Sequence, residues 1–204
     1  METPYACYLQ LPDLLGLQQP RTPDDQSEQW ADEHLFITVH QSAELLVSQA
    51  LVDLERAFQQ ARSGHAPTAI TALRRVTAVI CLLEDHLALL DHLTPESFAS
   101  FRPLLDNASG AQSSQFTELF QQITAPGCPS LSDTDPGTTP GMNEAGEREL
   151  TEEFRTLRAA VTRWRTRHLL LVERMIGDQA GTAGTSGLTY LRSQIDLPPH
   201  TTHG

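Results

Sequence analysis

Three long segments of this chain repeat apolar residues at intervals of three and four, and this spacing constrains the fold more than any other feature. The segments span about 31–61, 67–90 and 147–176. In the last segment the repeating positions are Leu150, Phe154, Leu157, Val161, Trp164, His168, Leu171 and Met175. Residues at this spacing share one face of an α-helix. Because we find no strand alternation and no internal repeat, we predict an all-α helical bundle.

Residues that start or stop helices divide the rest of the sequence. The pair Ser63-Gly64 ends the first long helix, and Pro67 suits the first turn of the second. Thr94 is a natural N-cap for a short helix, and another helix is predicted at about 112–123. Gly177 is a natural end for the last long helix.

A chain of 204 residues fits a single domain, which we assign to 1–204. Within it, residues 1–27 are predicted to form a helical N-terminal arm followed by a linker rich in Pro, Asp and Ser. The region 124–146 is rich in Pro, Gly, Ser, Thr and Asp, which is typical of a flexible surface loop. The tail at 198–204 is predicted to be disordered.

The charge balance is acidic, with a formal net charge of -12 and no lysine. This balance argues against nucleic acid or an anionic membrane as a partner. The three cysteines, Cys7, Cys81 and Cys128, are widely separated and form no CxxC pair. Together with an N-terminus that lacks a secretory pattern, they favour a reducing cytoplasmic location without disulfides or a zinc site.

Two of the long segments each carry one histidine on an otherwise apolar face, His40 in the first and His168 in the last. Either one alone is more often a core histidine with an ordinary hydrogen-bond partner. Burying imidazole without a partner costs about 1–3 kcal/mol, and a haem iron supplies such a partner while needing few protein ligands. The faces contain no HxxxH or ExxH pair, which disfavours zinc and di-iron sites.

Several arginines could bind carboxylates near these histidines. Arg163, Arg165 and Arg167 flank His168, and they are either a solvated helix face or a partner for a haem propionate. Arg102 is either an exposed charge at a helix end or a bidentate anchor for a substrate carboxylate.

Four segments together resemble the tryptophan 2,3-dioxygenase family, of which this chain looks like a short, divergent member. They are YACYLQLPDLLGLQ near the N-terminus, DEHLFITVHQSAELL at 32–46, FRPLLDNASGAQSSQF at 101–116 and WRTRHLLLVERMIGDQAGTAGTSGLTYLR at 164–192. They occur in the family's order and cover about 40% of the chain.

The resemblance implies a haem between two long helices, with His168 as the proximal iron ligand and Trp164 and Ser109 beside the cofactor. It implies that His40 is the catalytic distal residue that hydrogen-bonds the indole N–H. Arg102 would bind the substrate carboxylate, and Thr182 would meet the amino acid end of the substrate from a mobile loop. The implied substrate-binding set is Tyr5, Tyr8, Phe36, His40, Phe98, Arg102, Leu105, Ser109, Gly181 and Thr182. Tyr5 and Tyr8 would reach a neighbouring subunit, since the family is a homotetramer with exchanged N-terminal arms.

The implied reaction inserts both atoms of O2 across the C2–C3 bond of L-tryptophan or a close derivative, using ferrous haem b, and gives an N-formylkynurenine-type product. The chain departs from the family pattern at Ala111, Ala183 and Leu188, and its 124–146 segment is short. Two alternatives therefore remain: an indole mono-oxygenase of a modified tryptophan in secondary metabolism, and an inactive haem- or indole-binding module. A purely structural helical protein with core histidines is a third.

Overall fold

The computed structural model describes residues 3–23, 25, 27–124, 142–177 and 191–192. Within these ranges every regular element is helical, so the predicted all-α class is confirmed. The elements are α1 (Pro4–Leu9), α2 (Leu11–Leu15), α3 (Glu28–Arg62), α4 (Ala66–His86), η1 (Leu87–His92), α5 (Pro95–Phe101), η2 (Arg102–Leu105), η3 (Gly110–Gln112), α6 (Ser114–Thr124) and α7 (Glu144–Ile176), where η denotes a 3-10 helix. Cys128, Gly181, Thr182, Ala183 and Leu188 lie outside the described residues, as do most of 124–146 and all of 198–204.

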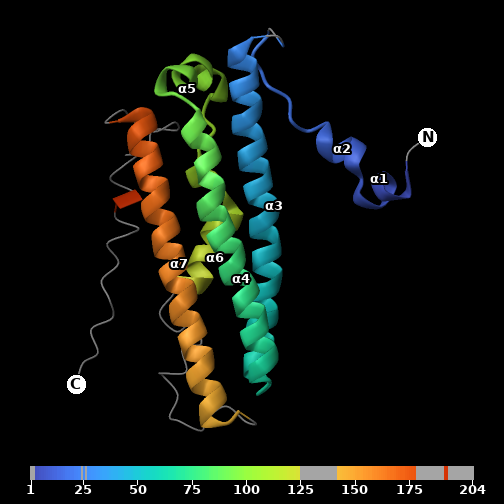
Figure 1. Cartoon of the computed structure of the whole chain (residues 1–204), viewed down its shortest axis with the longest axis vertical. Coiled ribbons are helices and arrows are strands. Elements are labelled where there is room, and N and C mark those ends of the chain that lie inside the picture. Colours follow the sequence, from blue (N-terminus) through green and yellow to red (C-terminus); the bar gives the residue numbers. More distant parts are fainter. Residues whose placement is uncertain (1–2, 24, 26, 125–141, 178–190, 193–204) are drawn as a thin grey trace.

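The three longest helices, α3, α4 and α7, run side by side, with α4 in contact with both of the others (Figure 1). Helix α6 packs against α3 and α7, and α5 lies at one end of the bundle (Figure 1). The short helices α1 and α2 extend away from the bundle as an arm (Figure 1). The site described below therefore depends on how three long helices face one another.

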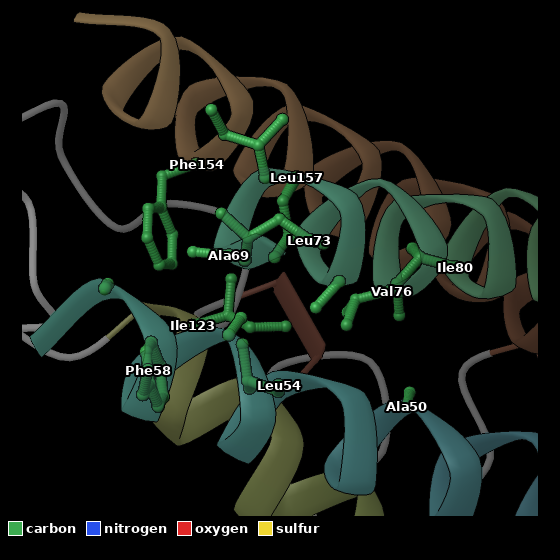
Figure 2. Packing of buried hydrophobic residues seen from close by; sticks show 14 of the residues in the cluster. Ala50, Leu54, Phe58, Ala69, Leu73, Val76, Ile80, Ile123, Phe154 and Leu157 are labelled. Atoms are coloured by element: carbon green, nitrogen blue, oxygen red, sulfur yellow. The ribbon is translucent and has the colours of Figure 1, made fainter. Parts of the chain in front are cut away.

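The larger hydrophobic core fills the end of the bundle where α3 turns back into α4. Figure 2 shows α3, α4, α6 and α7 all contributing side chains to it. Its fully buried members include Leu54, Leu73, Val76, Ile80, Ile123 and Leu157. Burying a leucine-sized side chain contributes about 1.5–3 kcal/mol, so this end of the bundle supplies most of the stability of the fold.

A second, smaller core lies at the other end, around Phe101, Leu93 and Leu171. Trp164 packs against both cores and so marks the level at which one gives way to the other. The apolar faces predicted for the first and last long segments are the faces that the two cores bury. The many apolar residues of the segment 67–90 predict a well-buried helix, and this prediction is wrong at Leu82 and Leu89, which are 50% and 45% exposed.

Capping residues explain where the helices begin and end. The predicted Thr94 cap is confirmed, since its hydroxyl accepts a hydrogen bond from Ser97 N. The first and last long helices begin three residues earlier than their apolar faces suggested, because Ser27 and Asn143 cap them. Gly177 ends α7 with a φ of 54°, a left-handed conformation that favours glycine.

Two helical stretches, Glu28–Arg62 and Ala66–His92, are long and apolar enough to cross a membrane by length and composition alone. The core helices of a helical bundle pass the same test. Glu33 and Asp53 are buried in the first stretch, and polar contacts within the protein satisfy both.

Glu33 fixes the linker of the arm to the bundle. Its carboxylate accepts hydrogen bonds from Arg21 N, Thr22 N and Thr22 Oγ1 at 2.9, 2.9 and 2.6 Å, and its side chain is 1% exposed. Burial raises the pKa of Glu33, but these hydrogen bonds and the Arg21 charge outweigh it, and the pKa is lowered overall. The predicted linker is thus held to α3 at its first residues.

We expect Glu33→Gln to lower the free energy of unfolding by about 1–3 kcal/mol at pH 7, because one charged acceptor of backbone and hydroxyl donors is lost. The folded-state pKa lies below the unfolded value. The contribution of the carboxylate is therefore fully present above the unfolded pKa, near 4.3, and is lost as the pH falls through the folded pKa. Urea denaturation at pH 7 and pH 3 would measure this loss of free energy of unfolding. Glu28→Gln is the control, because Glu28 is exposed. An equal difference at both pH values would contradict this assignment.

Candidate active site

A cavity of about 500 Å³ lies beside the junction of the two cores. Its walls come from α3, α4, η1, α5, α6 and α7 and from the segment between η2 and α6, so residues far apart in the sequence meet there. The side chains around it are largely apolar and aromatic, and a few histidine, serine, threonine and charged groups interrupt them. A mostly apolar cavity with a few polar groups is the usual form of a site for a small molecule or cofactor.

His168 faces this cavity from the middle of α7. Its ring stacks on Trp164, one turn earlier, with centroids 5.0 Å apart and planes 9° apart. Burial, and secondarily the nearby His40, lower the pKa of His168 to about 4, so the ring is neutral at physiological pH. Within the described part of the chain, no hydrogen bond satisfies its ring nitrogens. A neutral imidazole held by stacking and lacking a polar partner is well suited to bind a metal.

His40 faces the same cavity from α3, one turn after Phe36. Its Nδ1 lies 2.7 Å from the carbonyl oxygen of Phe36. Because a carbonyl only accepts, Nδ1 carries the proton and donates it, which leaves Nε2 of the neutral ring as an acceptor.

The accessible part of the His40 side chain faces the cavity, and protein encloses the rest of the ring. Burial is accordingly the main reason that the pKa of His40 is lowered, with a smaller contribution from His86. The hydrogen bond to the Phe36 carbonyl and the charge of Glu44 raise the pKa of His40, but they do not outweigh the effect of burial. His40 therefore also presents a neutral ring.

An aromatic cluster forms the end of the cavity nearest α5. The ring centroid of Phe36 lies 4.0 Å from that of His40, 5.7 Å from that of Phe98 and 5.6 Å from that of Phe101. Arg102 follows Phe101 directly, at the change from α5 to η2, and also borders the cavity. A guanidinium beside an aromatic wall can bind a carboxylate whose organic part packs on the rings.

Ion pairs across the bundle hold α7 in register with α4 and η1. Arg163 Nε lies 3.3 Å from Glu84, and Arg167 pairs with Asp91. Arg174 lies 3.4 Å from Asp91 and also donates to the carbonyls at the end of η1. A single exposed ion pair contributes little to stability. Several such pairs before and after His168 together fix the position of α7 along α4, and with it the level of the His168 ring in the cavity.

Eight of the predicted site residues border this cavity together: Phe36, His40, Phe98, Arg102, Leu105, Ser109, Trp164 and His168. The Ser109 hydroxyl is engaged locally, since it accepts a hydrogen bond from Ala111 N at 3.4 Å and caps η3. Tyr5 and Tyr8 do not border the cavity of their own chain, and they are 68% and 87% exposed on the arm. Gly181 and Thr182 lie outside the described residues.

Three cavity residues, His86, Phe116 and Phe120, were missed as site candidates. His86 borders the cavity at the end of α4, and the Ser42 hydroxyl on α3 lies 2.9 Å from its Nε2. The sequence carried a signal for it, because His86 lies three residues after Leu83 and four before Leu90 on the buried face. Phe116 and Phe120 of α6 both contact Trp164 at 5.2 Å between ring centroids, Phe116 stacked on the indole and Phe120 tilted against it.

The residues around the cavity fit a haem. His168 offers a neutral nitrogen donor, Trp164 fixes its ring, and the apolar side chains of α4, α6 and α7 suit a porphyrin. Of the three arginines near His168, Arg165 borders the cavity, whereas Arg163 and Arg167 pair with acids of α4 and η1. The fold and cavity thus define an all-α protein equipped to hold a histidine-ligated cofactor.

Comparison with known sequences gives the family. The tryptophan 2,3-dioxygenase family profile matches residues 1–125 and 143–198. The tryptophan 2,3-dioxygenase of Anaeromyxobacter dehalogenans (strain 2CP-C) is 30% identical, with 95% of this chain and 91% of the relative covered. The enzyme of Pseudomonas fluorescens (strain Pf-5) is 32% identical, with 94% of this chain and 86% of the relative covered. The enzyme of Burkholderia multivorans is 30% identical, with 95% of this chain and 79% of the relative covered. The chain belongs to the tryptophan 2,3-dioxygenase family.

It is accordingly an oxygenase enzyme of a family that uses haem and O2 and acts on tryptophan-like substrates. The match to the Anaeromyxobacter relative extends over 247 residues, more than the 204 of this chain, so that relative has segments that this chain lacks. The profile match is interrupted between 125 and 143, inside the segment predicted to be a shortened loop.

Proposed function

We propose that this chain dioxygenates the C2–C3 bond of L-tryptophan or a close derivative, using ferrous haem b and O2, and forms an N-formylkynurenine-type product. The observation that carries this proposal is the pair of neutral histidines, His40 and His168, that face one apolar cavity from two different helices. The proposal also rests on family membership across most of the chain.

In this proposal the two histidines have different roles because their surroundings differ. His168 has no hydrogen bond within the described residues and would bind the haem iron. His40 has its Nδ1–H engaged by Phe36 O, so its Nε2 lone pair would accept the indole N–H. Haem, when bound, supplies the iron centre that activates O2.

The other residues of the cavity would orient the substrate and exclude water. Arg102 would bind the substrate carboxylate, and Phe36 and Phe98 would pack on the indole. Leu105 and Ser109 would complete the wall, and Gly181 and Thr182 would close over the amino acid end. Holding the indole in one orientation in the cavity would be worth several kcal/mol of the barrier, because it removes the cost of bringing the reactants together.

Arg165 is our candidate for a haem propionate partner. It borders the cavity, and its guanidinium carbon lies 4.8 Å from the centroid of the Phe120 ring. Stacking on Phe120 would hold the planar guanidinium in place for a carboxylate.

We further propose that the chain is one domain and works as a homo-oligomer in the cytoplasm, a dimer or a tetramer, with arms exchanged between subunits. The support is the exposed apolar surface of the arm, on Tyr5, Tyr8, Leu9, Leu15 and Leu17. An arm that leaves the bundle with this surface exposed gains stability by packing on another subunit. In this arrangement Tyr5 and Tyr8 enter the substrate cavity of the partner.

Turnover under ¹⁸O2 tests the reaction. We expect haem-loaded protein to convert L-tryptophan into a ring-opened formyl product that contains two labelled oxygens, measured by mass spectrometry. A product with one labelled oxygen and an intact indole skeleton would instead establish mono-oxygenation. The mono-oxygenation outcome is included because Ala111 borders the cavity at a position where the family usually has phenylalanine. If haem and tryptophan bind but no O2 is consumed, the chain is an inactive binding module.

A further inference from the structure

We propose that His86, anchored by Ser42, is a specificity-determining residue that recognises a hydroxyl group on the N1 side of the indole ring. The preferred substrate would then be tryptophan hydroxylated at carbon 6 or 7. This inference rests on the proposed function, because it assumes that an indole amino acid occupies the cavity.

The first step is that His86 is positioned by a specific contact between helices. It is the last residue of α4, it is half-buried, and it borders the cavity. Its Nε2 lies 2.9 Å from the Ser42 hydroxyl of α3. Ser42 is itself held by the carbonyls of Thr38 and Val39, at 2.6 and 3.1 Å.

The second step assigns the protons. Ser42 has one hydroxyl proton, and the 2.6 Å distance to Thr38 O, an atom that only accepts, indicates that the proton goes there. Ser42 Oγ then accepts from His86 Nε2–H. The other ring nitrogen, Nδ1, remains an acceptor, and it has no hydrogen-bond partner among the described residues. Burial lowers the pKa of His86, which favours the neutral ring that this arrangement requires.

The third step relates this acceptor to the substrate. Ser42 follows His40 along α3, and both His40 and His86 border the cavity, so the two imidazoles belong to the same α3–α4 wall. Arg102 lies at the α5 end of the cavity, beyond Phe36 and Phe98. Ser42 and its partner His86 lie farther along α3 from the α5 end than His40 does, so a substrate with its carboxylate at Arg102 and its indole N–H at His40 would direct carbons 7 and 6 toward His86.

A hydroxyl on that edge can donate to Nδ1 of His86, and unsubstituted tryptophan leaves this acceptor unpaired. A binding site that leaves a buried polar group unpaired discriminates against the substrate that lacks its partner. Leu83 and Leu87 on the same wall supply no hydrogen-bonding group, and the Glu44 carboxylate, which also borders the cavity, already accepts a hydrogen bond from Gln115 Nε2 at 2.8 Å. The selectivity is therefore assigned to His86.

The test measures dissociation constants of haem-loaded protein for tryptophan and for its 4-, 5-, 6- and 7-hydroxy derivatives, by absorption titration and calorimetry. We expect the 6- or 7-hydroxy compound to bind about tenfold more tightly than tryptophan, and His86→Leu to remove this ratio while affinity for tryptophan changes less than about threefold. Ser42→Ala, which frees the imidazole, should reduce the ratio in part, and His86→Gln should retain part of it. Thermal unfolding of each variant would show that it is folded.

Two outcomes would overturn the inference alone: equal affinities for all five ligands in the unsubstituted protein, or a His86→Leu effect that is the same on every ligand. If no indole amino acid binds to the haem-loaded protein, the proposed function itself is overturned, and this inference with it. Direct binding constants separate these cases, because they do not depend on turnover.

Discussion

His168→Ala is expected to abolish tight haem binding, with the dissociation constant weakened by more than about 100-fold. The substitution removes the imidazole nitrogen that α7 offers as an iron ligand, which makes no hydrogen bond to a described residue. It leaves Trp164 and the apolar walls of the cavity in place. The measurement is a haem titration of the apoprotein followed at the Soret band. Added imidazole is expected to restore part of the absorption, because it can occupy the gap that the lost ring leaves.

The apoprotein of this variant should be as stable as the unsubstituted apoprotein. His168 is a buried imidazole that makes no hydrogen bond to described residues, so removing it relieves about as much desolvation cost as it loses in packing against Trp164. His92→Ala is a matched control, since His92 is exposed and does not border the cavity. Unchanged haem affinity in His168→Ala would show that another residue binds the iron.

Arg102→Ala is expected to raise the KM for L-tryptophan about 10- to 100-fold while haem remains bound. A charge-assisted hydrogen bond to a carboxylate contributes roughly 1.5–3 kcal/mol, and each 1.36 kcal/mol is a factor of ten. The decisive measurement compares L-tryptophan with tryptamine, which lacks the carboxylate. Binding of tryptamine should be almost the same in both proteins.

Arg163→Ala provides the control for a lost surface arginine, because Arg163 pairs with Glu84 and does not border the cavity. The KM of the Arg163→Ala variant for L-tryptophan should stay within about twofold of that of the unsubstituted protein. An exposed ion pair contributes at most about 1 kcal/mol to stability and nothing to substrate binding. If Arg102→Ala weakened tryptophan and tryptamine binding equally, the guanidinium would be holding the shape of the cavity and not a carboxylate.

Helical periodicity alone predicted which faces of the long helices are buried, and with them the inward direction of His40 and His168. This succeeded because the side chains at intervals of three and four share a face whatever the partner helix is. The cap at Thr94 and the end at Gly177 were predictable for a similar reason, since both depend on local backbone chemistry. These features need no knowledge of which helices pack together.

The features that could not be predicted depend on contacts between helices. The pairing of Ser42 with His86 joins residues 44 positions apart, and nothing near either residue in the sequence reveals the other. Leu82 of α4 and Leu89 of η1 stay exposed because α3 and α7 pack on other sides of these two elements. The contact of Glu33 with the linker required knowing that residues 21 and 22 fold back onto α3.

The separation of the hydrophobic core into two parts has a consequence for how the enzyme matures. The larger part is closed by four helices and does not border most of the cavity, so the chain can fold from that end before any cofactor arrives. Most side chains of the smaller part, including Leu93 and Leu171, also border the cavity, so a cofactor bound there would add contacts to this part and stabilise it. Amide exchange in the apoprotein should accordingly be fast from Leu87 to Leu105 and slow from Val47 to Leu83, and cofactor binding should slow the first region alone.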